Sequence, residues 1–283
     1  MEVNSLFSVS GKVIAITGAA GVIYGNMAKA LAQNGAKIAL LDIFEDKAKD
    51  LAQSIQEAGG QAIGLKCDVL NSQSVQAALD EIVRAFGTVD VLINGAGGNR
   101  KGACVPPDGK FTDLVLEEVD AVFALNYKGT FLPSQVFCRY FAKKGKGSVI
   151  NTSSMSAYLP LTNVPGYSNA KAAVTNFTRW LAVQVKVDFP EADIRVNEIA
   201  PGFLDTTQNH ALLFNPDNTL TLRGHSIIRH TPMGRFGVPD ELVGAVIFLI
   251  SDAGSFMHGA TIPVDGGFHI FSGVGPLDEK RKK

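Results

Sequence analysis

Short runs of continuous apolar residues alternate along the chain with stretches in which apolar residues recur at helical spacing. The runs predict buried strands at residues 13–17, 37–42, 61–66, 89–94, 148–152, 194–199 and 261–264. The stretches between them predict helices at residues 27–33, 45–58, 72–86, 119–143, 170–187 and 239–250. Because continuous apolar runs are typical of parallel strands covered on both faces, the pattern predicts an α/β fold with a doubly wound, mainly parallel sheet of about seven strands flanked by helices.

No linker rich in proline, glycine or serine divides the chain, so we expect a single domain over residues 1–275. Two segments interrupt the alternation. Residues 95–110 are rich in glycine and proline, and residues 203–236 are long and mixed in character. Since loops or small helical lids of that length are usually functional, we expect a substrate lid at 203–236. The charged residues 276–283 predict a flexible tail.

Composition narrows the function classes. Hydrophobic residues make up 46% of the 283 residues and the formal net charge is −1, which excludes a disordered chain and leaves no basic surface for nucleic acid. The apolar run at 242–250 is about half as long as a membrane span, and no basic-then-apolar leader opens the chain. The three cysteines are widely spaced and the five histidines lack zinc-site spacing, so we expect a cytoplasmic protein without a metal site.

A glycine-rich turn, TGAAGVIYG at residues 17–25, lies directly after the first strand and opens the first helix. Such a turn lets the backbone approach a pyrophosphate at the helix N-terminus, although glycines also simply end strands. The residues expected to contact the cofactor here are Gly18, Gly21, Val22 and Ile23.

Further polar residues follow the other strands at the same edge of the sheet. Asp42 closes the second strand, 24 residues beyond Gly18, where an acid binds a ribose 2′-hydroxyl; a solvated residue at a strand end is the alternative. Asp42 would repel a 2′-phosphate and Ile43 offers it no cation, so the pattern favours NAD over NADP. The remaining strand ends predict contacts to the adenine and to the rest of the dinucleotide from Asp68, Val69, Asn94, Gly95 and Ala96.

Tyr167 and Lys171 lie one helical turn apart and share a face of the predicted helix. A neighbouring cation and a cationic nicotinamide would favour the phenolate and make Tyr167 a usable acid and base, whereas the simpler alternative is an exposed helical pair. Ser154, 13 residues before Tyr167, is placed to hydrogen-bond the reacting oxygen. Asn126 is a poor helix former inside a predicted helix, which suggests a role such as holding a water behind Lys171.

These motifs, in this order from residue 11 to 267, resemble the short-chain dehydrogenase/reductase family. The resemblance implies a Rossmann-like fold and a catalytic tetrad of Asn126, Ser154, Tyr167 and Lys171. It also implies that Lys171 binds the nicotinamide ribose and lowers the Tyr167 pKa. Further cofactor contacts are implied at Pro201, Gly202 and Thr206, with Thr206 on the nicotinamide carboxamide.

The chain departs from the family pattern in the turn after the first strand. The usual turn, T-G-x-x-x-G-x-G, would place glycines where this chain has Val22 and Tyr24, and the common NNAG reads NGAG at 94–97. Side chains at 22 and 24 would crowd the pyrophosphate turn. The local backbone is therefore expected to differ there, which puts the geometry of NAD binding in question.

Several longer stretches, including 201–213 and 223–237, resemble the D-mannonate oxidoreductase (fructuronate reductase) members of the family. This favours an NAD-dependent oxidoreductase that interconverts D-mannonate and D-fructuronate. The alternatives are a dehydrogenase for another polyol, gluconate or a 3-oxoacyl substrate, or a non-catalytic dinucleotide-binding protein. A hexonate needs a cation and many hydrogen-bonding groups. The candidates are Asn99, Arg100, Lys101, His210 and Arg223, although Arg100 and Lys101 could instead form a solvated loop face.

The segment 266–274, GGFHIFSGV, is similar to family C-termini that pack at a subunit interface. The resemblance therefore implies a homotetramer.

Overall fold

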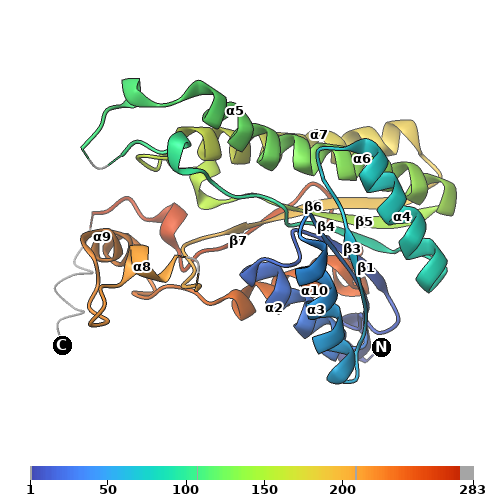
Figure 1. Cartoon of the computed structure of the whole chain (residues 1–283). Helices are drawn as coiled ribbons and strands as arrows, with labels where there is room; N and C mark the ends of the chain where they lie inside the picture. Colours follow the sequence, from blue (N-terminus) through green and yellow to red (C-terminus); the bar gives the residue numbers. More distant parts are fainter. Residues whose placement is uncertain (1, 107, 208, 275–283) are drawn as a thin grey trace.

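The protein, described by a computed structural model over residues 2–106, 108–207 and 209–274, is built on a seven-stranded parallel sheet (Figure 1). The strand order is β3-β2-β1-β4-β5-β6-β7. Their bounds are β1 (Val13–Thr17), β2 (Lys37–Asp42), β3 (Gln61–Lys66), β4 (Val91–Asn94), β5 (Lys146–Thr152), β6 (Asp193–Pro201) and β7 (Thr261–Val264). The predicted doubly wound sheet is confirmed, because the order reverses between β1 and β4, where open sheets bind ligands.

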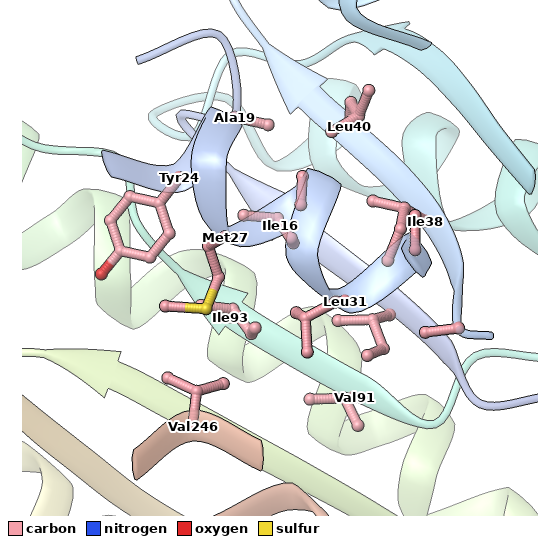
Figure 2. Packing of buried hydrophobic residues seen from close by; sticks show 14 of the residues in the cluster. Ile16, Ala19, Tyr24, Met27, Leu31, Ile38, Leu40, Val91, Ile93 and Val246 are labelled. Carbon is pink, nitrogen blue, oxygen red and sulfur yellow. The ribbon is translucent and has the colours of Figure 1, made fainter. Parts of the chain in front are cut away.

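Helices cover both faces of the sheet (Figure 1). One face carries α2 (Val22–Gln33), α3 (Glu45–Glu57) and α10 (Val243–Ile250), and the other carries α4 (Ser72–Phe86), α6 (Gly129–Lys144) and α7 (Pro165–Asp188). All five residues of β1 are buried, with Ile14 and Ile16 in one apolar cluster and Val13 and Ala15 in the other. A strand buried on both faces explains the continuous apolar runs of the sequence. Figure 2 shows the first of these clusters, between α2, the sheet and α10.

Several predicted helices differ in detail, and the helix expected at 27–33 begins at Val22. The predicted helix 119–143 is divided into α5 (Leu116–Phe123), a π-helical turn at Ala124–Lys128, and α6. The helix expected from residue 170 begins earlier, because Pro165 is preorganised for the first helical position. The helix expected at 239–250 starts as a 3-10 turn, Pro239–Leu242, before α10.

The segment 203–236 carries two short helices, α8 (His210–Leu213) and α9 (Leu222–His230), beyond the carboxyl end of the sheet (Figure 1). Leu213, Ile227 and Phe236 give it a small apolar cluster of its own. The short helix α1 (Val3–Leu6) precedes β1. Within the described ranges, no helix has both the length and the apolar character needed to cross a bilayer. The tail expected at 276–283 lies outside the described residues.

Candidate active site

The loops that follow β1 and β4 are in direct contact at the carboxyl edge of the sheet. The hydroxyl oxygen of Thr17 accepts hydrogen bonds from the backbone N–H groups of Gly95 (3.1 Å) and Ala96 (3.2 Å). Gly18 has a φ of +65°, and a Cβ there would lie 2.7 Å from the Ala96 Cα. Only glycine fits this position, so the turn gives the backbone the close approach that a nucleotide site needs.

The N-terminus of α2 meets the requirements of a diphosphate site. Gly21 is the N-cap, and no side chain in the described part of the chain caps the helix. The N–H groups of the first turn, at Val22 and Ile23, therefore remain for an anion, and the helix dipole favours negative charge there. The residues present fit the dinucleotide that the resemblance implies.

Asp42 has a structural role that the sequence did not predict, and its contact with a ribose stays a prediction. Its buried carboxylate accepts the N–H of Ala20 and the N–H of Phe44, each at 3.0 Å, and so fixes the glycine-rich turn to the start of α3. Each carboxylate oxygen has a second lone pair that remains for a ribose hydroxyl. Asp68 and Val69 follow β3 at the same edge, and the Asp68 carboxylate accepts the N–H of Leu70 at 2.9 Å.

Lys171 and Tyr167 share one face of α7 and are brought together as predicted. The Lys171 side chain is only 4% exposed, its Nζ donates to the Thr152 carbonyl at 2.8 Å, and it lies 5.5 Å from the centre of the Tyr167 ring. Burial lowers the pKa of Lys171 to about 8, an effect that the Glu198 carboxylate opposes.

The protonation of Tyr167 differs from the expectation that the phenolate is favoured. Burial raises the pKa of Tyr167, and the hydrogen bond with Ser154 only partly offsets this rise. A phenol with an ordinary pKa of about 10 is already neutral at pH 7, and burial of Tyr167 makes its ionisation less favourable still. A neutral phenol is a proton donor, which is the form that carbonyl reduction needs.

Asn126 lies on the π-helical turn and is fully buried. Its side-chain nitrogen donates to the carbonyls of Gly98 (2.7 Å) and Val122 (2.8 Å), and its oxygen accepts the Gly98 N–H at 3.2 Å. The side chain thus ties the helix to the loop after β4. A Cβ at Gly97 would lie 2.6 Å from the Asn126 Oδ1 and 3.4 Å from the Lys171 Nζ, which shows how closely these groups converge. The water-holding role of Asn126 stays a prediction.

Pro201 and Gly202 end β6 beside the same edge. A Cβ at Gly202 would lie 2.6 Å from the Asp265 Cα, so glycine is needed where the end of β6 passes the residue after β7. Thr206 is buried, and both its N–H (2.9 Å) and its hydroxyl (3.0 Å) donate to the Asn209 side-chain oxygen. The Thr206 hydroxyl is therefore held by a turn of the 203–236 segment, and its carboxamide contact stays a prediction.

A cavity of about 300 Å³ opens beside Ser154 and Tyr167. Its polar lining comes from Asn99, Ser154, Tyr167, Asn209 and Arg223, and the rest of its wall comes from Met155, Leu161, Val164, Pro201, Gly202, Phe203, Leu212 and Leu213. The guanidinium of Arg223 lies 6.0 Å from the centre of the Phe203 ring. Among the described residues, no carboxylate forms an ion pair with Arg223. The cavity thus places the Arg223 guanidinium in the same space as the Ser154 and Tyr167 side chains.

Three of the predicted substrate residues lie outside this lining. Arg100 forms an ion pair with Glu118 at 3.5 Å, and Lys101 is exposed on a 3-10 turn. His210 pairs with Asp205 at 2.9 Å. Of the predicted set, the structure brings Asn99 and Arg223 to the cavity. The apolar wall was not predicted, because its side chains come from separate loops that show no common sequence pattern.

A family model described as enoyl-(acyl carrier protein) reductase matches residues 18–269. The chain belongs to the short-chain dehydrogenase/reductase family. This family consists of oxidoreductases that act on alcohol and keto groups with a nicotinamide dinucleotide, so membership agrees with the pairing of Tyr167 and Lys171 on α7 beside the carboxyl edge of the sheet.

Several relatives match almost the full chain. An uncharacterized oxidoreductase, UxuB, of Bacillus subtilis is 45% identical over 94% of this chain and 98% of its own length. A Haemophilus influenza structure with bound NAD, provisionally named as a D-mannonate oxidoreductase, is 44% identical, with a TM-score of 0.87 over 94% of this chain and 98% of that one. A gluconate 5-dehydrogenase from Burkholderia cenocepacia, with NADP and tartrate, is 32% identical, with a TM-score of 0.82 over 94% of this chain and 98% of that one.

Proposed function

We propose that this protein is an NAD-dependent oxidoreductase that interconverts a sugar acid and its keto form, with D-mannonate and D-fructuronate as the favoured pair. The observation that carries the proposal is the position of Arg223 in the same cavity as Ser154 and Tyr167. A guanidinium binds a carboxylate through two hydrogen bonds, and Asn99 and Asn209 offer partners for hydroxyls. The resemblance to a protein named as a D-mannonate oxidoreductase supports the choice.

The chemistry assigned to the residues follows from their positions. When bound, the nicotinamide supplies or accepts the hydride. In the reduction, the neutral Tyr167 phenol donates its proton to the substrate carbonyl oxygen, and Ser154 hydrogen-bonds and orients that oxygen. The Lys171 ammonium stabilises the phenolate that remains. In the oxidation, the phenolate takes the proton back from the substrate hydroxyl.

The proposed cofactor end assigns the diphosphate to Gly18, Gly21, Val22 and Ile23. Asp42 takes the adenosine ribose, and its negative charge beside the exposed, uncharged Ile43 supports NAD over NADP. Asp68 and Val69 take the adenine, and the loop at 94–96 faces the nicotinamide ribose. Pro201, Gly202 and Thr206 line the nicotinamide end.

The test is turnover of a panel of aldonates and polyols with NAD, with mannonate first. We expect mannonate to have the highest kcat/KM, and Arg223→Met to lower its kcat/KM by about 10- to 100-fold through KM, because a charge-assisted pair is lost. Arg84→Met, which removes an exposed arginine of α4, serves as the matched control. An Arg223→Met variant whose kcat/KM for mannonate equals that of the parent would contradict the role of Arg223.

A gluconate-type or other polyol substrate is the second candidate, since the gluconate 5-dehydrogenase relative was solved with tartrate. The same panel separates the two, because failure on every hexonate removes the favoured pair. Absence of turnover combined with tight NAD binding in calorimetry would favour a non-catalytic dinucleotide-binding protein.

We also propose a cytoplasmic homotetramer. The three cysteines are free thiols, which agrees with a reducing compartment. Ile270 and Val274, near the end of the described chain, are exposed apolar residues and suit a subunit contact.

A further inference from the structure

Tyr24 is an aromatic residue in the first turn of α2, where the nucleotide turn meets the helix. Its side chain is 5% exposed and lies in the apolar cluster with Met27 and Ile93. Figure 2 shows Tyr24 and Met27 projecting from α2 toward the β4 side of the cluster, with the tyrosine hydroxyl at the far end of its ring. The ring therefore lies under the tips of the central strands rather than in the solvent.

The ring occupies space that a side chain at residue 95 would need. A Cβ on Gly95 would lie 2.4 Å from the Tyr24 Cδ2 and 2.6 Å from its Cε2. These separations are far below van der Waals contact, so the aromatic ring at 24 requires glycine at 95. Tyr24 is thus fitted to the loop after β4, which contacts the nucleotide turn.

The Tyr24 hydroxyl forms a hydrogen bond with the hydroxyl oxygen of Thr152, at the end of β5. Thr152 donates its own hydrogen to the Asn94 carbonyl at 2.6 Å. A hydroxyl has a single hydrogen, so Tyr24 is the donor and Thr152 the acceptor. Burial raises the pKa of Tyr24, which keeps the donor protonated.

Thr152 is also the residue whose backbone carbonyl accepts the Lys171 ammonium, at 2.8 Å. Tyr24 therefore holds the side chain of the same residue that holds Lys171 through its backbone. We propose that Tyr24 is a positioning residue that fixes Thr152 and, through it, places the Lys171 ammonium behind Tyr167. Its link to turnover rests on the proposed function, whereas its link to Lys171 does not.

The charged and titratable groups around Lys171 determine how its titration responds to a substitution at Tyr24. Tyr167 faces it from the same helix, Glu198 acts on it from β6, and Tyr24 stands behind Thr152 from α2. Replacing Tyr24 by phenylalanine removes the hydroxyl but no charge. A change in the Lys171 titration would then report the position of its carbonyl acceptor rather than a lost ion pair.

The experiment follows the Lys171 Nζ by NMR of ¹⁵N-lysine-labelled protein without cofactor, assigned with Lys171→Met. In Tyr24→Phe, the Thr152 carbonyl that accepts the Lys171 ammonium is less well fixed, so we expect Lys171 to lose its proton at lower pH than in the parent. We also expect kcat/KM to fall about 3- to 10-fold, while the NADH Kd changes less than about 2-fold. Tyr140→Phe is the matched control. Tyr140 lies on α6, away from the tetrad, and its hydroxyl also donates to a threonine, Thr88.

A double-mutant cycle completes the test. In a Thr152→Val background, which lacks the acceptor hydroxyl, Tyr24→Phe is expected to have no further effect on the Lys171 titration. An unchanged titration in Tyr24→Phe, even with a lower melting temperature, overturns the proposal and leaves a packing role. A shifted titration in a protein that turns over no sugar acid would keep this inference and overturn the proposed function.

Discussion

Lys171 is an ammonium group in a place that disfavours charge. Its pKa of about 8 in the folded protein is below the ordinary value of 10.5, and the cause is burial. Below pH 8 the folded protein carries the full penalty of that buried cation. Between pH 8 and 10.5 the unfolded chain binds the extra proton, so stability contributed by this residue rises with pH.

Lys171→Met is therefore expected to stabilise the protein at pH 7 while abolishing turnover. The lowered pKa of Lys171 corresponds to about 3 kcal/mol of free energy of unfolding. The gain in the variant is smaller than this, because the hydrogen bond from Lys171 to Thr152 is lost. Urea unfolding at pH 7 and pH 10 checks this, and the advantage of the variant is expected to shrink at the higher pH. A variant less stable than the parent at pH 7 would contradict the prediction.

Asp42 gives a second prediction at the residue scale. Asp42→Asn combined with Ile43→Arg removes a negative charge and adds a cation at an exposed position. We expect the ratio of NADP to NAD affinity to rise at least about 10-fold, since roughly 1.4 kcal/mol of altered charge interaction suffices. Calorimetry with both cofactors measures the ratio. Ile43→Leu is the control, and an unchanged ratio in the double variant would remove Asp42 as the selective group.

Single residues were predictable where their chemistry lies in a local pattern. Tyr167 and Lys171 are one turn apart on one helix, so their meeting follows from the sequence. The contact of Tyr24 with Thr152 could not be predicted in the same way. It depends on Gly95 and Thr152, which lie on other strand ends and reach Tyr24 only through the fold.

At the scale of elements, the π-helical turn between α5 and α6 is the main departure from the predicted fold. The sequence there has an unbroken helical pattern, so local periodicity predicts one helix. The wider turn carries the buried Asn126, whose three hydrogen bonds join it to Gly98 and Val122. The π turn thus occurs where Asn126 contacts Gly98, a residue distant in the sequence, and a local sequence pattern cannot predict such a contact.

Asn126→Ala is expected to lower the free energy of unfolding by about 2–3 kcal/mol, because the buried Val122 carbonyl and the half-buried backbone groups of Gly98 lose their partners. Urea denaturation gives the value. Asn34→Ala removes an amide that also donates to a carbonyl, at 2.8 Å from Ala30, but at an exposed position, and is expected to change stability by less than about 1 kcal/mol. Equal losses in the two variants would argue against a special role for the turn.

At the scale of the whole molecule, α7 presents a row of exposed apolar side chains. Trp180, Val183 and Val187 lie at helical spacing on its outer side, and the Trp180 ring stacks on Phe177. A contiguous apolar stripe on a helix marks an interaction surface. The sequence predicts the sheet and its covering helices, but this stripe is distinguishable from core residues only once the direction of α7 is known.

Light scattering after size exclusion is expected to give a mass four times that of the 30.0 kDa chain. Trp180→Glu places a charge in the stripe and is expected to reduce the mass to that of a dimer or a monomer. Gln53→Glu, which adds the same charge at an exposed position of α3, serves as the control. A parent protein that elutes as a monomer would refute the tetramer, and an unaffected Trp180→Glu tetramer would exclude this stripe.

The contact between Tyr24 and Gly95 also restricts how this branch of the family can diverge. Enlarging residue 95 first would force it into the ring, and shrinking residue 24 first would leave an empty space above Gly95 and remove the hydroxyl from Thr152. Each single step passes through a less stable protein, whereas the two changes together remove the clash. The pair is therefore epistatic. Substitutions at residues 24 and 95 are expected to occur together, because the residue tolerated at one position depends on the residue present at the other.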